Sequence, residues 1–524
     1  MKGMNFMNES IWQKSMANEK ENNYLENPQN VNGGENNKKN QKKRIDICII
    51  GAGITGITCA YELSKLGYSI AIVEKNQVGS GTTGKTTGKI TSQHDTFYNY
   101  LEKSFEIDVA KKYLEANQKA IDKIENRVKK ENIDCNFERL NSYVYTTKSD
   151  EVQILKDEFN TLEKLNFDCD FVEKLDLPFN IEAGISFKNQ AQFNPLKYLN
   201  KLTEIILEKG NKIYTNTIAK SIEKSDDGYI VETDKQNIKA EFVIIASHYP
   251  FLKLQGLYSA KMYQSMSYLI AIKTKEKLPQ GMYISISNPN ISIRKAIYNN
   301  EEVLLIGGGD HKTGKSTTYE ESYGRLEEFA KKYYPDARII AKWNAQDCIT
   351  LDKIPYIGQA STFLPNVYVA TGFKKWGMTL STVAADIIVD NIKGFKNPYE
   401  EIFSSLRMQP IKNHKEMKNM LVDSTNALLV NKLKEDGIIT QNLQNGFGGI
   451  VEIENRKIGI YKTENGEVFA VNPKCTHLGC LLMWNQIEKT WDCPCHGSRF
   501  DYKGKNICNP AYDDLDIIDL SDLE

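Results

Sequence analysis

The sequence predicts an α/β fold: a Rossmann-like dinucleotide-binding domain with an interleaved α+β substrate domain, followed by a separate all-β domain. Two observations predict this division. A short apolar run at residues 44–50 leads into the glycine-rich turn GAGITG, and strand-like and helical patterns then follow one another to about residue 396. From residue 436 onward, short alternating strands and turns replace them, which is typical of a small β domain.

Length and charge limit the possibilities further. A chain of 524 residues exceeds what one hydrophobic core usually supports, so two or three domains are expected. Its 67 basic and 68 acidic residues nearly cancel, which argues against a general electrostatic mode of nucleic-acid binding. The predicted boundaries are a polar flexible leader at residues 1–44, the α/β unit at 45–396, a connecting segment at 397–435 and the β domain at 436–524.

The lack of a recognisable targeting signal and the scattered cysteines predict a cytoplasmic protein. The start of the chain lacks the apolar core of a signal peptide, and no apolar run is long enough for a transmembrane segment. Isolated cysteines are typical of small buried residues, so no disulfide scaffold is expected across the chain. The isolated ones are Cys48, Cys59, Cys135, Cys169, Cys348 and Cys508.

Three glycines after the first predicted strand indicate a dinucleotide site. Gly51, Gly53 and Gly56 have the spacing that gives a tight turn, room for a pyrophosphate and close packing of the following helix. The start of that helix offers free N–H groups and a positive dipole end to phosphates. Glu74 ends the next predicted strand, where its carboxylate can accept hydrogen bonds from ribose hydroxyls. This order of elements favours a nucleotide site over an incidental glycine turn.

The middle of the α/β unit has a mixed pattern. Apolar positions over residues 97–128 recur at helical spacing, which predicts one long or two consecutive amphipathic helices. Strand-like pieces between residues 141 and 346 belong partly to the nucleotide-binding sheet and partly to a second sheet, and the sequence does not assign each one. The glycine cluster at residues 307–314 lacks the spacing of a second nucleotide site, so we expect a turn there. Residues 366–394 predict a last strand, a glycine-bearing turn and a closing helix.

Two segments indicate which dinucleotide is bound. Residues 79–95, GSGTTGKTTGKITSQHD, and residues 371–379, TGFKKWGMT, resemble the D-amino-acid-oxidase-like flavoproteins, also called glycine-oxidase-like or sarcosine-oxidase-like. This resemblance covers residues 46–393 and implies bound FAD, with the late glycine turn near the pyrimidine end of the flavin. Backbone N–H groups there would stabilise the negative charge of reduced flavin. The cofactor contacts predicted in addition to the residues above are Lys75, Thr82, Thr83, Gly372, Gly377 and Met378.

A concentration of histidine and cysteine near the C-terminus predicts metal binding, because thiolates and imidazoles are the side chains that bind soft or borderline metals. The residues concerned are Cys475, His477, Cys480, Cys493, Cys495 and His496. A tetrahedral zinc site of two cysteines and two histidines would leave Cys480 and Cys495 unexplained.

The motifs CTHLGC and CPCHGS resemble those of the Rieske family, and the resemblance extends over residues 448–516. It implies a [2Fe-2S] cluster whose imidazole ligands raise the reduction potential above that of an all-cysteine cluster. The implied assignments are Cys475 and Cys493 on one iron, His477 and His496 on the other iron, and a disulfide between Cys480 and Cys495.

Two positions depart from the Rieske pattern. Phe500 stands where the cytochrome-complex proteins have a tyrosine that donates to a cysteine sulfur, and Asn509 replaces the usual glycine before a proline. Ser498 keeps a second donor. Because a lost donor makes the reduced cluster harder to stabilise, we expect a reduction potential below those of the cytochrome-complex proteins, within the Rieske range of roughly −150 to +300 mV.

Catalytic residues are not assigned by the sequence. His94, His248 and His311 lie in or near the motifs of the flavoprotein part, and Arg294 is of the type that holds a substrate carboxylate. Each has an ordinary alternative as a structural histidine or a surface arginine.

The resemblances predict an FAD-dependent oxidoreductase that oxidises a small amine or amino acid. Electrons would leave singly through the Rieske cluster to an external acceptor. Two alternatives stay open: a reductase running in the opposite direction, with a donor protein at the cluster, and a redox sensor or electron carrier without small-molecule turnover. A ring-hydroxylating oxygenase is disfavoured because no spare site of two histidines and one carboxylate is evident.

Overall fold

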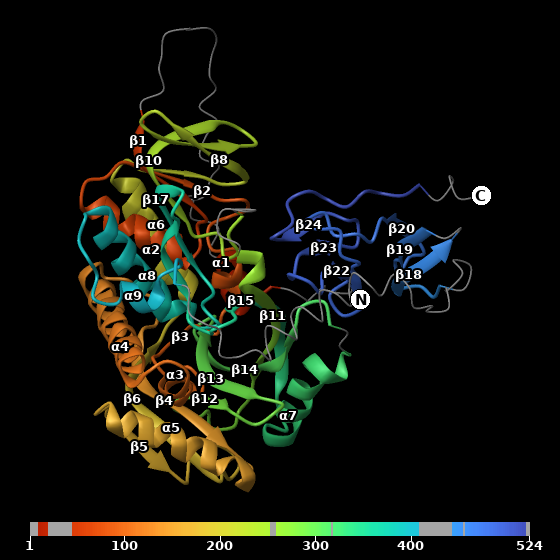
Figure 1. Ribbon diagram of the computed structural model, residues 1–524. Coiled ribbons are helices and arrows are strands. Elements are labelled where there is room, and N and C mark those ends of the chain that lie inside the picture. The colour runs from red at the N-terminus through yellow and green to blue at the C-terminus, as the bar shows by residue number, and fades with distance from the viewer. Residues whose placement is uncertain are drawn as a thin grey trace.

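The computed structural model describes residues 9–18, 44–251, 258–315, 318–407, 443–453 and 456–519. Figure 1 shows the C-terminal domain, in blue, beside a larger α/β part. Strands β22 to β24 lie on the side toward β15 and β11, and β18 to β20 lie farther away. Among the described helices, none is long and apolar enough to cross a membrane. The cytoplasmic location stays a prediction.

The first sheet holds the predicted nucleotide-binding unit. Its strands in spatial order are β16 (Tyr356–Ser361), β17 (Leu364–Thr371), β10 (Asn237–Ile245), β1 (Ile45–Ile50), β2 (Ile70–Val73) and β7 (Lys212–Tyr214), with β9 (Gly228–Thr233) and β8 (Ala219–Ser225) attached to β10. From β17 to β7 the neighbouring strands are parallel, and the central ones are apolar along their length because both faces are covered. Helix α2 (Ile54–Lys65) packs against α6 (Pro195–Glu208) and α8 (Gly377–Ile392).

The second sheet is mostly antiparallel. Its strands in order are β15 (Arg338–Thr350), β11 (Met262–Lys273), β14 (Glu301–Lys312), β13 (Ile291–Tyr298), β12 (Met282–Ser285), β4 (Glu138–Thr146), β6 (Ala183–Gln192) and β3 (Lys89–Ile90), with β5 (Cys169–Val172) beside β6. Its helices are α5 (Val152–Lys164) and α7 (Arg325–Tyr333). The amphipathic run at 97–128 forms two helices, α3 (Phe97–Ser104) and α4 (Ile107–Lys130), as one of the two predicted alternatives had it.

The turn predicted at residues 307–314 is wrong over most of its length. Residues 307–312 continue strand β14, which pairs with β11 across a register shift between Met266 and Tyr268. Glycine is needed at this irregular pairing: Gly308 has φ +158°, and a Cβ there would lie 2.3 Å from the carbonyl oxygen of Asn290. The glycines therefore accommodate an irregular strand.

The C-terminal domain consists of two small sheets. One contains β18 (Gly448–Ile453), β19 (Arg456–Lys462) and β20 (Val468–Val471), and the other contains β21 (Met483–Asn485), β22 (Thr490–Asp492), β23 (Arg499–Asp501) and β24 (Asn506–Cys508). All neighbouring strands are antiparallel, which confirms the predicted all-β character. Two long loops, one between β20 and β21 and one between β22 and β23, carry the cysteine and histidine motifs.

The flexible leader predicted for residues 1–44 is wrong for residues 9–18. Helix α1 (Ile11–Asn18) packs beside α6, and Ser10, Ile11 and Trp12 are buried. The indole of Trp12 donates to the carbonyl of Thr86 at 2.8 Å. Residues 19–43 lie outside the described residues, and so does most of the predicted connecting segment, from residue 408 to 435. Its described start contains helix α9 (Glu400–Phe403).

Replacing Trp12 with alanine is expected to destabilise the protein by about 3–5 kcal/mol, the usual cost of deleting a large buried aromatic side chain. Trp12 is 1% exposed, and its ring lies over the guanidinium of Arg294. Urea unfolding followed by tryptophan-independent circular dichroism measures the effect. Phe363, which is 81% exposed, is the control, and its replacement by alanine should change stability by less than about 0.5 kcal/mol. Equal stability of the two variants would contradict the structural role of α1.

Candidate cofactor site and metal centre

The glycine turn after β1 has no room for a side chain at two of its three glycines. Gly51 has φ +108°, and a Cβ there would lie 2.5 Å from the carbonyl oxygen of Ala246 at the end of β10. A Cβ on Gly56 would lie only 1.9 Å from the carbonyl oxygen of Gly51. The turn therefore packs directly against its neighbours, and α2 begins immediately behind it.

A cavity of about 690 Å³ opens where the parallel strands end at their carboxyl edge. It has the size of a typical cofactor or ligand site. Its wall comes from both sheets and from the C-terminal domain. All predicted cofactor residues line it except Gly56, which packs behind the turn. The residues brought together are Gly51, Gly53, Glu74, Lys75, Thr82, Thr83, Gly372, Gly377 and Met378.

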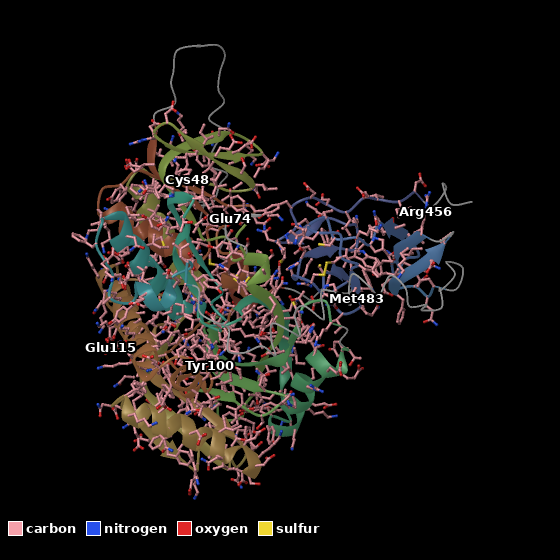
Figure 2. All side chains as sticks on the ribbon, viewed as in Figure 1. Cys48, Glu74, Tyr100, Glu115, Arg456 and Met483 are labelled. Carbon is pink, nitrogen blue, oxygen red and sulfur yellow. A yellow bond between two sulfur atoms is a disulfide. The ribbon has the colours of Figure 1, made fainter. Side chains whose placement is uncertain are left out.

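Glu74 braces the glycine turn. Its carboxylate accepts hydrogen bonds from the N–H groups of Ala52 at 2.8 Å and Asn76 at 2.9 Å, and burial raises its pKa. Two further acceptor positions of the carboxylate remain for a ligand. In the view of Figure 2, Glu74 lies between Cys48 and the C-terminal domain. The neighbouring Lys75 donates to the side chain of Asn506 in the C-terminal domain at 2.7 Å, so it joins the two domains at the cavity.

Two helices start at this cavity without a side-chain N-cap. Helix α2 begins after Gly53, and its N–H at Ile54 donates to the hydroxyl of Thr83 at 3.0 Å. Helix α8 begins at Gly377 after the turn that contains Gly372. Helix starts of this kind favour negative charge. Helix starts without an N-cap side chain, a glycine cradle and a ribose-type acceptor fit an FAD molecule, whose pyrophosphate would be held at the start of α2 and whose flavin would be held near the start of α8.

Two of the four catalytic candidates are histidines whose two ring nitrogens both have hydrogen-bond partners, and neither histidine lines the cavity. The ring nitrogens of His94 contact the hydroxyl of Tyr113 at 2.7 Å and the carbonyl of Thr91 at 2.8 Å. His311 contacts the hydroxyl of Tyr268 and a backbone carbonyl, each at 3.0 Å. Their surroundings are those of structural histidines.

Arg294 does not reach the cavity, and this corrects its prediction as a carboxylate-binding residue. The guanidinium is buried behind the site and donates to the carbonyl oxygens of Gly88 at 3.0 Å and Phe193 at 3.4 Å. Desolvation lowers its pKa to about 9. His248 is the one catalytic candidate that lines the cavity, and burial lowers its pKa to about 4.

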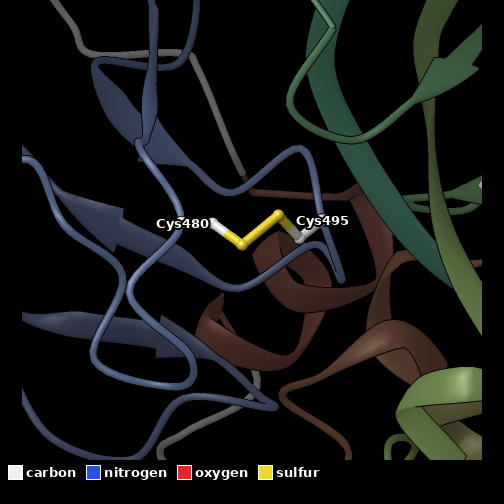
Figure 3. The surroundings of a disulfide bond; sticks show 2 residues. All are labelled: Cys480 and Cys495. Atoms are coloured by element: carbon white, nitrogen blue, oxygen red, sulfur yellow. A yellow bond between two sulfur atoms is a disulfide. The ribbon is translucent and has the colours of Figure 1, made fainter. Parts of the chain in front are cut away.

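The two cysteine and histidine loops of the C-terminal domain face each other. The first loop is closed by a hydrogen bond from Cys475 N–H to the Cys480 carbonyl, and the second by one from Cys493 N–H to the Ser498 carbonyl, each at 2.8 Å. Cys480 and Cys495 form a disulfide that links the loops, as Figure 3 shows. Thus the sequence-predicted pairing is the one present in the structure.

The four predicted metal ligands form two contacting pairs on these loops, and the sulfur of Cys493 lies within 4.8 Å of both disulfide sulfurs. The thiols of Cys475 and Cys493 contact each other, and that hydrogen bond lowers the pKa of Cys475 and raises the pKa of Cys493. The rings of His477 and His496 are 5.0 Å apart. His496 is 9% exposed, and its Nδ1 atom has no hydrogen-bond partner among the described residues. Burial lowers the pKa of His496 to about 4, which keeps it in the neutral form that binds metal. Two thiols and two neutral imidazoles in this arrangement fit the predicted cluster.

The loops of the metal centre are bound to the wall of the cofactor cavity. Gln264 on β11 donates its side-chain amide to the carbonyl of His496 at 2.8 Å and to that of Asn509 at 2.9 Å. Gln346 on β15 donates to the carbonyl of Gly497 at 2.7 Å. Both glutamines line the cavity. The two candidate sites therefore share a wall.

Two glycines allow the C-terminal domain and the α/β part to pack closely at this wall. Gly497 has φ +81°, and a Cβ there would lie 2.6 Å from the Cβ of Gln264. A Cβ on Gly314 would lie 2.4 Å from the Cα of Pro494. Side chains at either position would separate the domains.

Sequence reasoning missed Gln264, Gln346 and Asp347, which all line the cavity. The partners of the two glutamines come from segments 232 and 151 residues away, so no local spacing indicates them. The available signal was weaker: buried polar residues on strands whose neighbours are largely apolar.

Residues 46–391 match the protein family described as FAD dependent oxidoreductase, and residues 438–519 match the Rieske [2Fe-2S] domain. The chain belongs to the FAD dependent oxidoreductase family. It is 41% identical over 475 residues to the Rieske 2Fe-2S iron-sulfur protein YhfW of Bacillus subtilis, covering 91% of this chain and 93% of that protein. It is 20% identical over 372 residues to gamma-glutamylputrescine oxidoreductase of Escherichia coli, covering 68% of this chain and 85% of that protein.

Among solved structures, glycine oxidase from Geobacillus kaustophilus superposes with a TM-score of 0.61 at 20% sequence identity, over 70% of this chain and all of that chain. This likeness concerns the fold. Together with the family matches, it confirms the predicted fold class and both predicted cofactors, FAD and a [2Fe-2S] cluster. The protein is therefore an FAD-dependent oxidoreductase with a Rieske domain. The match to the Rieske family favours an iron-sulfur cluster over the alternative zinc site.

Proposed function

We propose that the protein oxidises a small amine or amino acid at its FAD site and passes the electrons singly, through its Rieske domain, to an external acceptor protein. The observation that carries this proposal is the hydrogen bond from Gln264, on the cavity wall, to the backbone of the candidate ligand His496. A relative named for gamma-glutamylputrescine and a solved structure named for glycine support a substrate of this class.

The electron balance fits two cofactors in one chain. Conversion of an amine to an imine removes a hydride, which is two electrons and a proton, and one further proton. Bound FAD supplies the two-electron acceptor for such a step, and a Rieske centre supplies a one-electron carrier. The protein brings the two cofactor sites close together, because Gln264 and Gln346 hold the loop that carries His496 against the cavity.

Stopped-flow mixing under nitrogen tests the proposal and its alternatives. With a panel of amines and amino acids, we expect loss of flavin absorbance first and appearance of the reduced-cluster signal second. Reduction from the cluster side, with FAD bleaching second, would favour the reductase alternative. A panel that leaves the flavin oxidised throughout would favour a sensor or carrier.

A double variant with leucine at Gln264 and Gln346 tests the route between the cofactors. It removes two hydrogen bonds to the loop that carries His496 and one to Asn509, each worth about 1 kcal/mol, so the loop should sit less firmly against the cavity and cluster reduction should slow by at least roughly tenfold. Rapid-freeze electron paramagnetic resonance measures this step. Replacement of Gln359 by leucine, on β16 and bonded to its own strand, is the control and should keep the wild-type rate. An unchanged rate in a double variant that reduces its flavin normally would contradict the route.

A further inference from the structure

One carboxylate on the wall of the cofactor cavity makes no direct hydrogen bond or ion pair with another described residue. The carboxylates on its wall are Glu74, Asp95, Asp310 and Asp347. Glu74 accepts two backbone N–H groups, as described above. Asp95 and Asp310 each form an ion pair with a lysine: Lys374 lies 3.6 Å from Asp95, and Lys375 lies 2.6 Å from Asp310. Within the part of the chain that the structure describes, the carboxylate of Asp347 makes no direct hydrogen bond or ion pair, and the nearby charge of Lys375 acts on it without contact.

The position of Asp347 directs it into the cavity. Asp347 itself lines the cavity, and so does Ile349, which is two residues further along β15 and therefore on the same face of the strand. Ile349 pairs with Phe373, which follows Gly372 in the glycine turn. Asp347 therefore lies on the cavity side of β15, close to the end where α8 begins.

The buried surroundings of Asp347 make its ionised carboxylate unfavourable in free energy. Asp347 is 9% exposed, and burial raises its pKa to about 6, with the charge of Lys375 opposing the rise and that of Asp310 adding to it. At neutral pH most of the population is still ionised. A buried charge that makes no direct hydrogen bond or ion pair is unfavourable, and such groups in clefts are typical of sites whose direct partner arrives with a ligand.

We propose that Asp347 binds a positively charged nitrogen of the substrate, so that the substrate enters the cavity as an ammonium-type cation. The inference rests on the proposed function and names the recognition element for it. An N–H group of the cation would donate a charge-assisted hydrogen bond to the carboxylate, and the paired Asp310 would stand beside it. The buried position of Arg294 agrees with this, because that arginine does not line the cavity, and Arg499, which does, is paired with Asp492 at 3.0 Å.

Guanidinium and urea test the inference without turnover. The two molecules have nearly the same shape, only guanidinium is charged, and neither has a C–H bond to oxidise. Each is titrated at millimolar concentration and fixed ionic strength into the FAD-loaded, full-length protein, and the flavin difference spectrum is followed. We expect the wild type to bind guanidinium at least tenfold more tightly than urea. In Asp347→Asn the affinity for guanidinium should fall about 10- to 100-fold, the loss of one hydrogen bond to a charged group.

Two further variants complete the test. Asp347→Glu keeps the charge and should retain part of the preference for guanidinium, so it decides the matter if Asp347→Asn fails to hold FAD. Asp170→Asn changes an exposed carboxylate on β5 and should leave both affinities unchanged. A wild type that does not prefer guanidinium to urea would overturn the inference. So would an Asp347→Asn protein whose flavin potential shifts while its cation preference stays, since the carboxylate would then serve the cofactor.

The outcomes separate this inference from the proposed function. If Asp347 governs guanidinium binding and no amine reduces the flavin, the cation site stands and the proposed oxidation fails. If amines reduce the flavin of wild type and Asp347→Asn with equal KM, the oxidation stands and the cation site fails.

Discussion

Replacing Cys493 with serine is expected to abolish the [2Fe-2S] cluster and leave FAD bound. Cys493 is buried and in contact with Cys475, so its loss removes one of two thiolates and leaves an incomplete ligand set. Iron should fall from about two atoms per chain to near zero, and the paramagnetic signal of the reduced cluster should disappear. Electron delivery to a one-electron acceptor should fall to the level of the flavin alone. Metal analysis and electron paramagnetic resonance on protein purified under nitrogen provide the measurement.

Cys508 offers a matched control for this variant. It is a half-buried free cysteine on β24, in the same domain, and it lines the cofactor cavity without belonging to the predicted ligands. Its replacement by serine should retain iron, signal and flavin. Zinc in place of iron in the wild type, or an intact cluster in the Cys493 variant, would show that the ligand assignment is wrong.

The parts of the fold that the sequence predicts are those set by local chemistry. The order of strand, glycine turn and helix at Gly51 depends on contacts between residues close in sequence, and the packed glycines leave a readable spacing. The two motifs of the C-terminal domain are readable for the same reason, because each loop closes on itself by its own backbone hydrogen bonds.

The parts that the sequence does not predict depend on contacts between distant segments. Arginine is a residue type that often binds a substrate carboxylate. Only the positions of Gly88 and Phe193 in the structure show that Arg294 donates to backbone carbonyls instead. Helix α1 was hidden because its two buried residues are embedded in a long polar stretch. Lys75 has a fitting position beside Glu74, yet its partner Asn506 lies 431 residues away.

Replacing Gly56 with alanine is expected to abolish FAD binding and to destabilise the α/β unit. The new Cβ would lie 1.9 Å from the carbonyl oxygen of Gly51, and a backbone atom in a packed turn cannot yield as a side chain can. Helix α2 would have to move away from β1, which shifts the helix start that the pyrophosphate needs. We expect flavin content close to zero and a loss of about 1–3 kcal/mol of unfolding free energy, the usual cost of overpacking. Flavin absorbance per chain and urea unfolding measure the two effects.

Gly53 and Gly449 separate the two roles of these glycines. A Cβ on Gly53 would meet only the hydroxyl of Thr83, at 3.2 Å, so alanine there should weaken FAD binding by occupying the space of the pyrophosphate while leaving the apoprotein nearly as stable as the wild type. A Cβ on Gly449 meets nothing within 4 Å, and alanine there should change neither quantity. If Gly56→Ala kept its flavin and its stability, α2 could not be packed on the turn as the structure has it. If Gly53→Ala bound FAD at wild-type affinity, the pyrophosphate would have to lie away from this turn.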